Sequence, residues 1–177
     1  MFAHAGDLGV DSSRIVIGGA SAGGGLTAGL ALLARDRREV PVAFQLLIYP
    51  MIDDRNVTPA SYAITDPRVW HRESNRLGWK AYLGRDGGGD DVSPYAAAAR
   101  ATNLTNLPPA YIPVGALDLF IDENIEYAQR LIQAGVPTEL HVYPGAFHGF
   151  DVFAPSAAVS KQFKAERDHV LKRALHP

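Results

Sequence analysis

Gly19-Ala20-Ser21-Ala22-Gly23 places a serine between two glycines, directly after an apolar run. The preceding residues 14–18 predict a short buried strand, because β-branched residues dominate them. Residues 22–35 are mostly small residues and leucines and predict a helix. A serine between glycines at a strand-to-helix junction is typical of a nucleophile elbow, a strained turn that lifts the hydroxyl clear of the sheet. We expect a Cβ at either flanking glycine to collide with the neighbouring strand or helix.

The glycine-rich stretch also fits interpretations other than catalysis. The pentapeptide alone fits a simple tight turn about as well as a catalytic one. Residues 23–28 fit the dinucleotide pattern G-x-G-x-x-A, but they begin inside the predicted helix, and no acidic residue follows at the expected distance. A P-loop requires Lys-Ser or Lys-Thr after the glycines, which this chain lacks. The sequence therefore disfavours a nucleotide site.

Composition limits the class of protein and its partners. The chain has 177 residues, 47% of them hydrophobic and 20% charged, with a formal net charge of −2, which predicts a globular domain without a nucleic-acid partner. It has no cysteine, which excludes a disulfide scaffold, a thiol nucleophile and a cysteine-ligated metal. No histidine pair shows metal-ligand spacing, so we expect no metal and no cofactor. The absence of a signal peptide and of a long apolar segment predicts a cytoplasmic protein without a membrane span.

The remaining pattern predicts one α/β domain over residues 1–177. Further strands are expected at 42–49, 110–115 and 138–143, and further helices at 122–134 and 156–175. Alternating strands and helices indicate a mostly parallel sheet flanked by helices. Residues 52–107 interrupt this alternation and predict an excursion from the sheet that carries one helix, at about 69–83.

Two later residues complete a possible catalytic set. A serine hydroxyl needs a base within hydrogen-bond reach and an acid that orients the base. Asp118 lies three residues beyond the third predicted strand, and His148 lies five beyond the fourth, so both belong to the same sheet edge as Ser21. Each also has an ordinary interpretation. Asp118 could cap the next helix, although Asp122 is better placed as its N-cap, and His148 could be a simple loop residue.

At this point the chain resembles a known family. Residues 13–24, 107–110, 114–118 with Asp122 and Glu123, and 143–150 are similar to the motifs of hormone-sensitive-lipase-like carboxylesterases of the α/β-hydrolase fold. The resemblance implies that Ser21 is the nucleophile and His148 the general base and acid. It also implies that Asp118 orients the histidine and that the backbone N–H of Ala22 is one oxyanion-hole donor.

The chain departs from the family pattern at several places. Ala20 stands where many members carry aspartate, and Ala98 stands where proline is usual. The His-Gly-Gly-Gly motif that supplies further oxyanion donors is absent before Ser21, and the glycines at 87–89 lie elsewhere and follow an aspartate. The resemblance implies that the chain is the C-terminal portion of a longer hydrolase, lacking the N-terminal strands and cap.

These observations lead to a hypothesis about activity. We expect a serine carboxylesterase that hydrolyses short- to medium-chain acyl esters through an acyl-enzyme, with a small-molecule ester as substrate. A catalytically silent fragment lacking most of the oxyanion hole stays open, as does a hydrolase or acyl transferase with another acyl substrate. The strand at 14–18 would have an unpaired edge, so we expect the chain to self-associate into a homo-oligomer.

Overall fold

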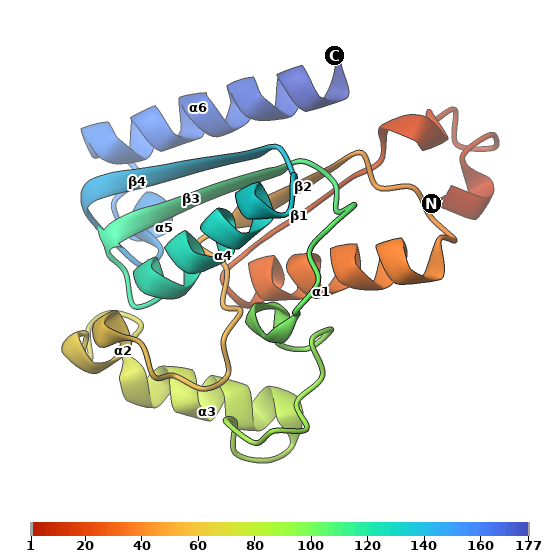
Figure 1. Cartoon of the computed structure of the whole chain (residues 1–177). Coiled ribbons are helices and arrows are strands. Elements are labelled where there is room, and N and C mark those ends of the chain that lie inside the picture. The colour runs from red at the N-terminus through yellow and green to blue at the C-terminus, as the bar shows by residue number, and fades with distance from the viewer. Residues whose placement is uncertain (1, 177) are drawn as a thin grey trace.

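The computed structural model describes residues 2–176 and contains one four-stranded parallel sheet with the order β1-β2-β3-β4 (Figure 1). The strands are β1 (Val16–Ala20), β2 (Phe44–Ile48), β3 (Ala110–Leu117) and β4 (Thr138–Phe147). Two neighbouring parallel strands must be joined by a crossover connection, and the predicted helices between the strands provide these connections. The predicted α/β architecture, a parallel sheet flanked by helices, is therefore confirmed.

Helices cover both faces of this sheet. Those bordering the sheet are α1 (Ala22–Arg37), α4 (Ile121–Gln133), α5 (Phe150–Phe153) and α6 (Ala158–Leu175). Figure 1 shows α1 and α4 on one face and α6 on the other. The first face buries a core that includes Leu32, Leu47 and Ile112, all at most 1% exposed. On the other face, Val170 of α6 packs with Tyr111.

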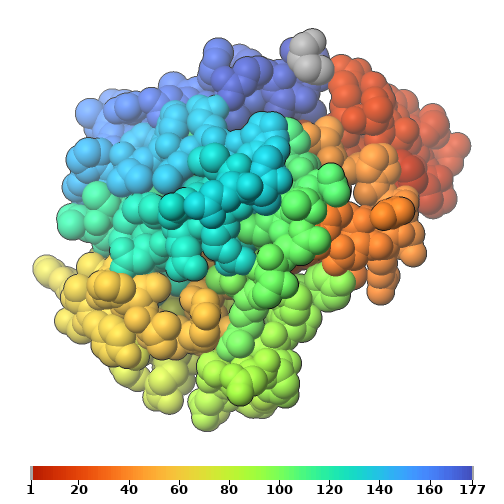
Figure 2. All heavy atoms as spheres, viewed as in Figure 1, coloured from red at the N-terminus to blue at the C-terminus, as the bar shows by residue number. Residues whose placement is uncertain are grey.

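The connection from β2 to β3 leaves the sheet. It contains α2 (Pro59–Ala63), α3 (Arg72–Leu83) and the 3₁₀ turn Ala98–Arg100, and no strand. In the space-filling view, the yellow and yellow-green segments that carry α2 and α3 form the lower part of the molecule (Figure 2). Trp79 of α3 is 2% exposed and packs with Leu119 and Phe120, so the excursion shares a small core with the loop after β3. The excursion thus lies beside the carboxyl edge of the sheet.

Three local predictions were wrong. β1 begins at Val16, after a 3₁₀ turn at Ser12–Arg14, and it is only partly buried because among residues 2–176 it pairs with β2 alone. Helix α4 begins at Ile121, so Asp122 is not its N-cap. Instead, Asp122 lies in the first turn and accepts a 2.7 Å hydrogen bond from the backbone N–H of Ala60. Strands β3 and β4 also extend farther than predicted, which changes the positions of the site residues.

Among the described residues, no helix has both the length and the apolar character that crossing a bilayer demands.

Candidate active site

Ser21 occupies the single-residue turn between β1 and α1. Its backbone has φ 57° and ψ −121°, a conformation that residues with a side chain rarely adopt. Three backbone hydrogen bonds hold this turn: Ser21 donates to the carbonyl of Ile48, and its own carbonyl accepts from Gly25 and Met51, at 2.9–3.0 Å. Backbone strain of this kind persists only when its surroundings fix it, and it is characteristic of the nucleophile elbow.

The glycines around Ser21 have different roles. A Cβ at Gly19 would lie 2.3 Å from the carbonyl oxygen of Gly23, so this position requires glycine. A Cβ at Gly23 would meet no atom within 4 Å, so the predicted collision there is wrong. The following glycines are also constrained: a Cβ at Gly24 would lie 2.9 Å from Pro50 Cβ, and one at Gly25 would lie 2.0 Å from the carbonyl oxygen of Met51. The glycine run therefore lets α1 approach the segment after β2, a long-range contact that no local pattern reveals.

Asp118 and His148 each follow directly after a strand, because β3 extends to Leu117 and β4 to Phe147. The structure brings both residues to Ser21. His148 Nδ1 lies 2.8 Å from Asp118 Oδ2, and His148 Nε2 lies 2.9 Å from Ser21 Oγ. Asp118 is 1% exposed and His148 is 9% exposed. This geometry fits an Nδ1–H that donates to the carboxylate, which leaves the Nε2 lone pair to accept from the serine hydroxyl.

Aromatic side chains enclose the imidazole. The rings of Tyr49 and Phe120 meet the His148 ring edge-on, with centroids 4.8 and 5.0 Å away. The Tyr49 hydroxyl donates a 2.8 Å hydrogen bond to Asp151. Burial, and then this carboxylate, raise the pKa of Tyr49, so its phenol stays a neutral donor. Excluding water around the imidazole strengthens its interaction with Asp118, because the local dielectric constant is lower than in water.

Ala22 is the first residue of α1, and it is exposed. The N–H groups in the first turn of a helix have no partner within the helix, and the helix dipole adds positive potential there. The Ala22 N–H therefore has the position and polarity to stabilise an oxyanion that forms at Ser21. The glycine loop at 87–89 has another role, since the Gly88 N–H donates a 2.7 Å hydrogen bond to Asp54.

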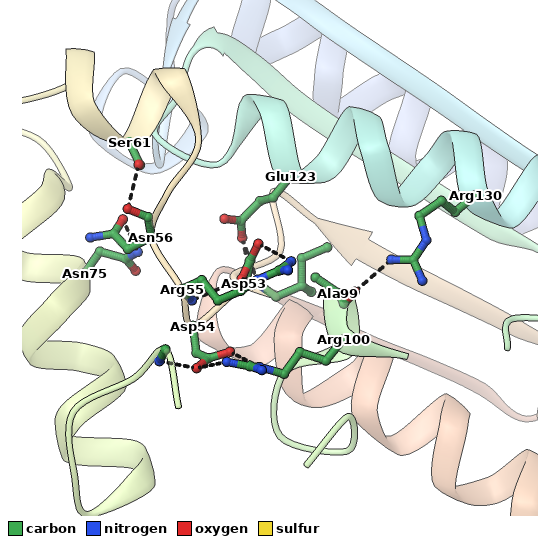
Figure 3. A network of polar contacts seen from close by, with 12 residues as sticks. Asp53, Asp54, Arg55, Asn56, Ser61, Asn75, Ala99, Arg100, Glu123 and Arg130 are labelled. Carbon is green, nitrogen blue, oxygen red and sulfur yellow. Dashed lines mark hydrogen bonds and ion pairs between the residues drawn. The ribbon is translucent and has the colours of Figure 1, made fainter. Parts of the chain in front are cut away.

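A buried glutamate at the start of α4 binds the backbone of the segment that follows β2. Glu123 is 3% exposed and accepts hydrogen bonds from the backbone N–H groups of Ile52 at 2.9 Å and Asp53 at 3.3 Å (Figure 3). Burial raises the pKa of Glu123 well above its usual value of 4.5. Since Met51 in the same segment bonds to the Ser21 carbonyl, this carboxyl group links the nucleophile turn to the helix that follows Asp118. The sequence pointed to Glu123 only through the family resemblance.

A buried ion pair joins the beginning of the excursion to its final part. Asp54, whose side chain is fully buried, accepts hydrogen bonds from the Arg100 guanidinium at 2.6 and 2.9 Å (Figure 3). Burial on its own would raise the pKa of Asp54, but hydrogen bonds from Arg100 and from Gly88 outweigh it and lower the pKa below 3.8. Local sequence gave no sign of this pair, because its members are 46 residues apart.

The residues described by the structure include no cluster of three or more histidine, aspartate, glutamate or cysteine residues that could hold a metal ion.

Comparisons with known proteins agree with this geometry. Residues 1–152 match a family model described as an alpha/beta hydrolase fold. Carboxylesterase NlhH of Mycobacterium tuberculosis is 35% identical over 176 residues, which cover 98% of this chain and 54% of NlhH. Esterase LipI of the same organism is 35% identical over 151 residues, covering 85% of this chain and 47% of LipI. The chain thus spans about half the length of the curated relatives it matches.

Solved structures show the same similarity. A bacterial heroin esterase superposes with a TM-score of 0.93 at 48% identity, over 99% of this chain and 56% of the esterase. Esterase LipW from Mycobacterium marinum superposes with a TM-score of 0.92 at 40% identity, over 99% of this chain and 55% of LipW. Together with the strained serine turn and the parallel sheet, these matches show that the chain belongs to the α/β-hydrolase family, with the hormone-sensitive-lipase-like carboxylesterases.

Proposed function

We propose that the chain carries the catalytic machinery of a serine carboxylesterase acting on short- to medium-chain acyl esters. Ser21 is the nucleophile in this proposal, His148 the general base and acid, and Asp118 the residue that orients the imidazole. The observation that carries it is the continuous hydrogen-bonded chain from Asp118 through His148 to the hydroxyl of Ser21, at 2.8 and 2.9 Å, on a strained turn.

The chemistry follows from these contacts. Ser21 Oγ attacks the ester carbonyl carbon while His148 Nε2 takes the hydroxyl proton, and the carbonyl oxygen becomes an oxyanion that the Ala22 N–H stabilises. When the intermediate collapses, the C–O bond to the alcohol breaks and His148 returns the proton to the departing oxygen. Water, deprotonated by the same imidazole, then attacks the acyl-enzyme and releases the carboxylic acid and free Ser21. Asp118 keeps its charge throughout and stabilises the imidazolium.

The names of the relatives support the reaction class. NlhH is a carboxylesterase, and LipI and LipW are esterases. Each is longer than this chain, so hydrolysis by these 177 residues is a proposal and needs its own measurement.

The test is hydrolysis of 4-nitrophenyl butanoate by the purified chain and by two serine variants. Ser21→Ala should lower kcat by several orders of magnitude, because the three residues act as a unit. Ser156→Ala is the matched control, since Ser156 is exposed and lies outside the site, and it should leave kcat unchanged. Equal activity in wild type and Ser21→Ala, or no hydrolysis by the wild type, would contradict the proposal.

A further inference from the structure

A small apolar cavity adjoins the proposed nucleophile. It has a volume of about 160 Å³ and lies between α1, the segment after β2 and α3. Its lining consists mainly of apolar and aromatic side chains: Ser21, Ala22, Leu26, Met51, Trp70, Trp79, Tyr82 and Ala96, with Gly25 and Gly78. Leu26 and Tyr82 are about half exposed, so they mark the side of the cavity that is open to solvent.

The cavity lies on the acyl side of the site. An alcohol leaving group must receive its proton from His148, which does not line the cavity. Of the three aromatic rings around His148, the two nearest, Tyr49 and Phe120, lie outside the cavity, and only the most distant, Trp70 at 6.3 Å, lines it. Ala22, whose N–H is the proposed oxyanion donor, does line it. An ester bound with its carbonyl oxygen at Ala22 and its alcohol oxygen at His148 therefore directs its acyl group toward this cavity.

Gly78 is unusual among the lining residues, because it lies in the interior of α3. Glycine within a helix costs roughly 0.5–1 kcal/mol relative to alanine. At Gly25 a Cβ would lie 2.0 Å from backbone, so glycine there is required by packing. At Gly78 a Cβ would meet only side-chain atoms, Trp70 Cζ2 at 3.2 Å and Met51 Cε at 3.5 Å, both belonging to residues that line the cavity. The fold thus tolerates alanine at Gly78, while the cavity would become smaller.

The wall opposite Gly78 is held in place. The indole N–H of Trp70 donates to Asn75 Oδ1 at 3.4 Å, and the Asn75 side-chain amide donates to Asn56 Oδ1 at 3.0 Å. Figure 3 shows Asn75 and Asn56 next to each other, and Asn75 is fully buried. These contacts restrain Trp70, so a methyl group at Gly78 shifts the ring only slightly and takes up space in the cavity.

The geometry points to Gly78 as a specificity-determining residue. Because Gly78 has no side chain, the cavity beside Ser21 accepts an acyl group of up to about six carbons. This inference rests on the proposed esterase function. The size limit comes from comparison, since a dry apolar cavity of about 150 Å³ holds one benzene molecule. Acetyl to hexanoyl groups are accommodated inside, whereas a decanoyl chain must extend past Leu26 and Tyr82 into solvent. The specificity is thus for short acyl chains.

The first experiment measures kcat/KM for 4-nitrophenyl acetate, butanoate, hexanoate and decanoate. The wild type should prefer butanoate or hexanoate to decanoate. Gly78→Ala should lower the hexanoate-to-acetate ratio of kcat/KM by about tenfold or more, because one methylene of misfit in a hydrophobic pocket has an effect of that size. The control is Ala81→Gly, which changes the helix propensity of α3 at an exposed position outside the cavity and should leave the ratio unchanged. An unchanged ratio in Gly78→Ala would overturn the inference.

A second experiment does not depend on catalysis. The chain has two tryptophans, Trp70 and Trp79, and both line the cavity, so intrinsic tryptophan emission reports directly on it. Cyclohexanol, a compact six-carbon probe, should produce a saturable change in emission in wild type and in Ser21→Ala. In Gly78→Ala the Kd for cyclohexanol should be at least several-fold higher. If esters are not hydrolysed but cyclohexanol binds with this dependence, the esterase proposal fails and the size limit at Gly78 stands. No saturable binding, or the same Kd in Gly78→Ala, would overturn the size limit.

Discussion

Removing the Asp54 carboxylate should cost a large part of the stability of the fold. In the wild type this fully buried side chain satisfies two guanidinium N–H groups of Arg100 and the N–H of Gly88. Asp54→Ala leaves the Arg100 guanidinium without its partner, and the Arg100 side chain is only 14% exposed. Breaking a buried pair in this way costs about 3–5 kcal/mol. Domains are stable by about 5–15 kcal/mol, so the loss is at least a fifth of the total.

Urea denaturation followed by circular dichroism measures this loss. Thermal unfolding should show a midpoint lowered by roughly 6–20 °C, given about 2–4 °C per kcal/mol for a domain of this size. The control is Asp86→Ala, which removes an exposed carboxylate 3.4 Å from Lys80 and should cost less than about 1 kcal/mol. A double variant, Asp54→Leu with Arg100→Met, should recover most of the loss, because apolar side chains of similar volume avoid the unpaired charge.

The pH dependence gives a further check on Asp54. Its pKa is lower in the folded state than its usual value of 3.8, so its contribution to stability is present above pH 3.8 and is lost as pH falls through the folded pKa. The difference in unfolding free energy between wild type and Asp54→Ala should therefore be constant near neutral pH and shrink in acid. A difference below about 1 kcal/mol at pH 7 would refute the reasoning that this pair holds the excursion in place.

Three other perturbations test separate parts of the structure. Asp118→Asn should lower kcat for ester hydrolysis by about 10⁴-fold, because the amide favours the wrong histidine tautomer, and near-normal kcat would shift the orienting role to another residue. Glu123→Gln keeps a carbonyl acceptor for the backbone N–H groups but removes the ionisable group. Because burial raises the folded pKa of Glu123 above 4.5, wild-type stability should fall relative to this variant as pH rises from 4.5, and parallel urea-midpoint profiles would contradict this. Finally, β1 has an unpaired edge within residues 2–176, and α1, which packs against β1, exposes Leu26 and Leu30. Light scattering should therefore show self-association, and a monomer at all concentrations would contradict it.

Local sequence patterns predict the parallel sheet and its main helices. Apolar periodicity and glycines that end a helix can each be recognised within a single segment. The chain order of Ser21, Asp118 and His148 predicts that they meet, and the structure places them within hydrogen-bond distance, while their catalytic roles stay predictions. The length of β4 was underestimated because Pro144 and Gly145 suggested a turn, yet β4 continues through them to Phe147.

Features that depend on distant contacts could not be predicted in this way. The exposure of β1 depends on which strands pair with it, and the need for glycine at Gly25 depends on the carbonyl of Met51. The Asp54–Arg100 pair joins the two ends of the excursion, and the cavity beside Gly78 brings α1 together with α3. In each case the deciding neighbour lies far away in the sequence, so a window of nearby residues carries no signal.

The most direct test of the account is the site of covalent modification by a fluorophosphonate, mapped by peptide mass spectrometry. This reagent reacts with an activated serine, and Ser21 is the one that the structure places against a histidine held by a buried aspartate. We expect a single adduct on Ser21 that is strongly reduced in His148→Ala. An adduct on another serine, or labelling of Ser21 at the same rate in His148→Ala, would contradict the claim that Ser21 is an activated nucleophile.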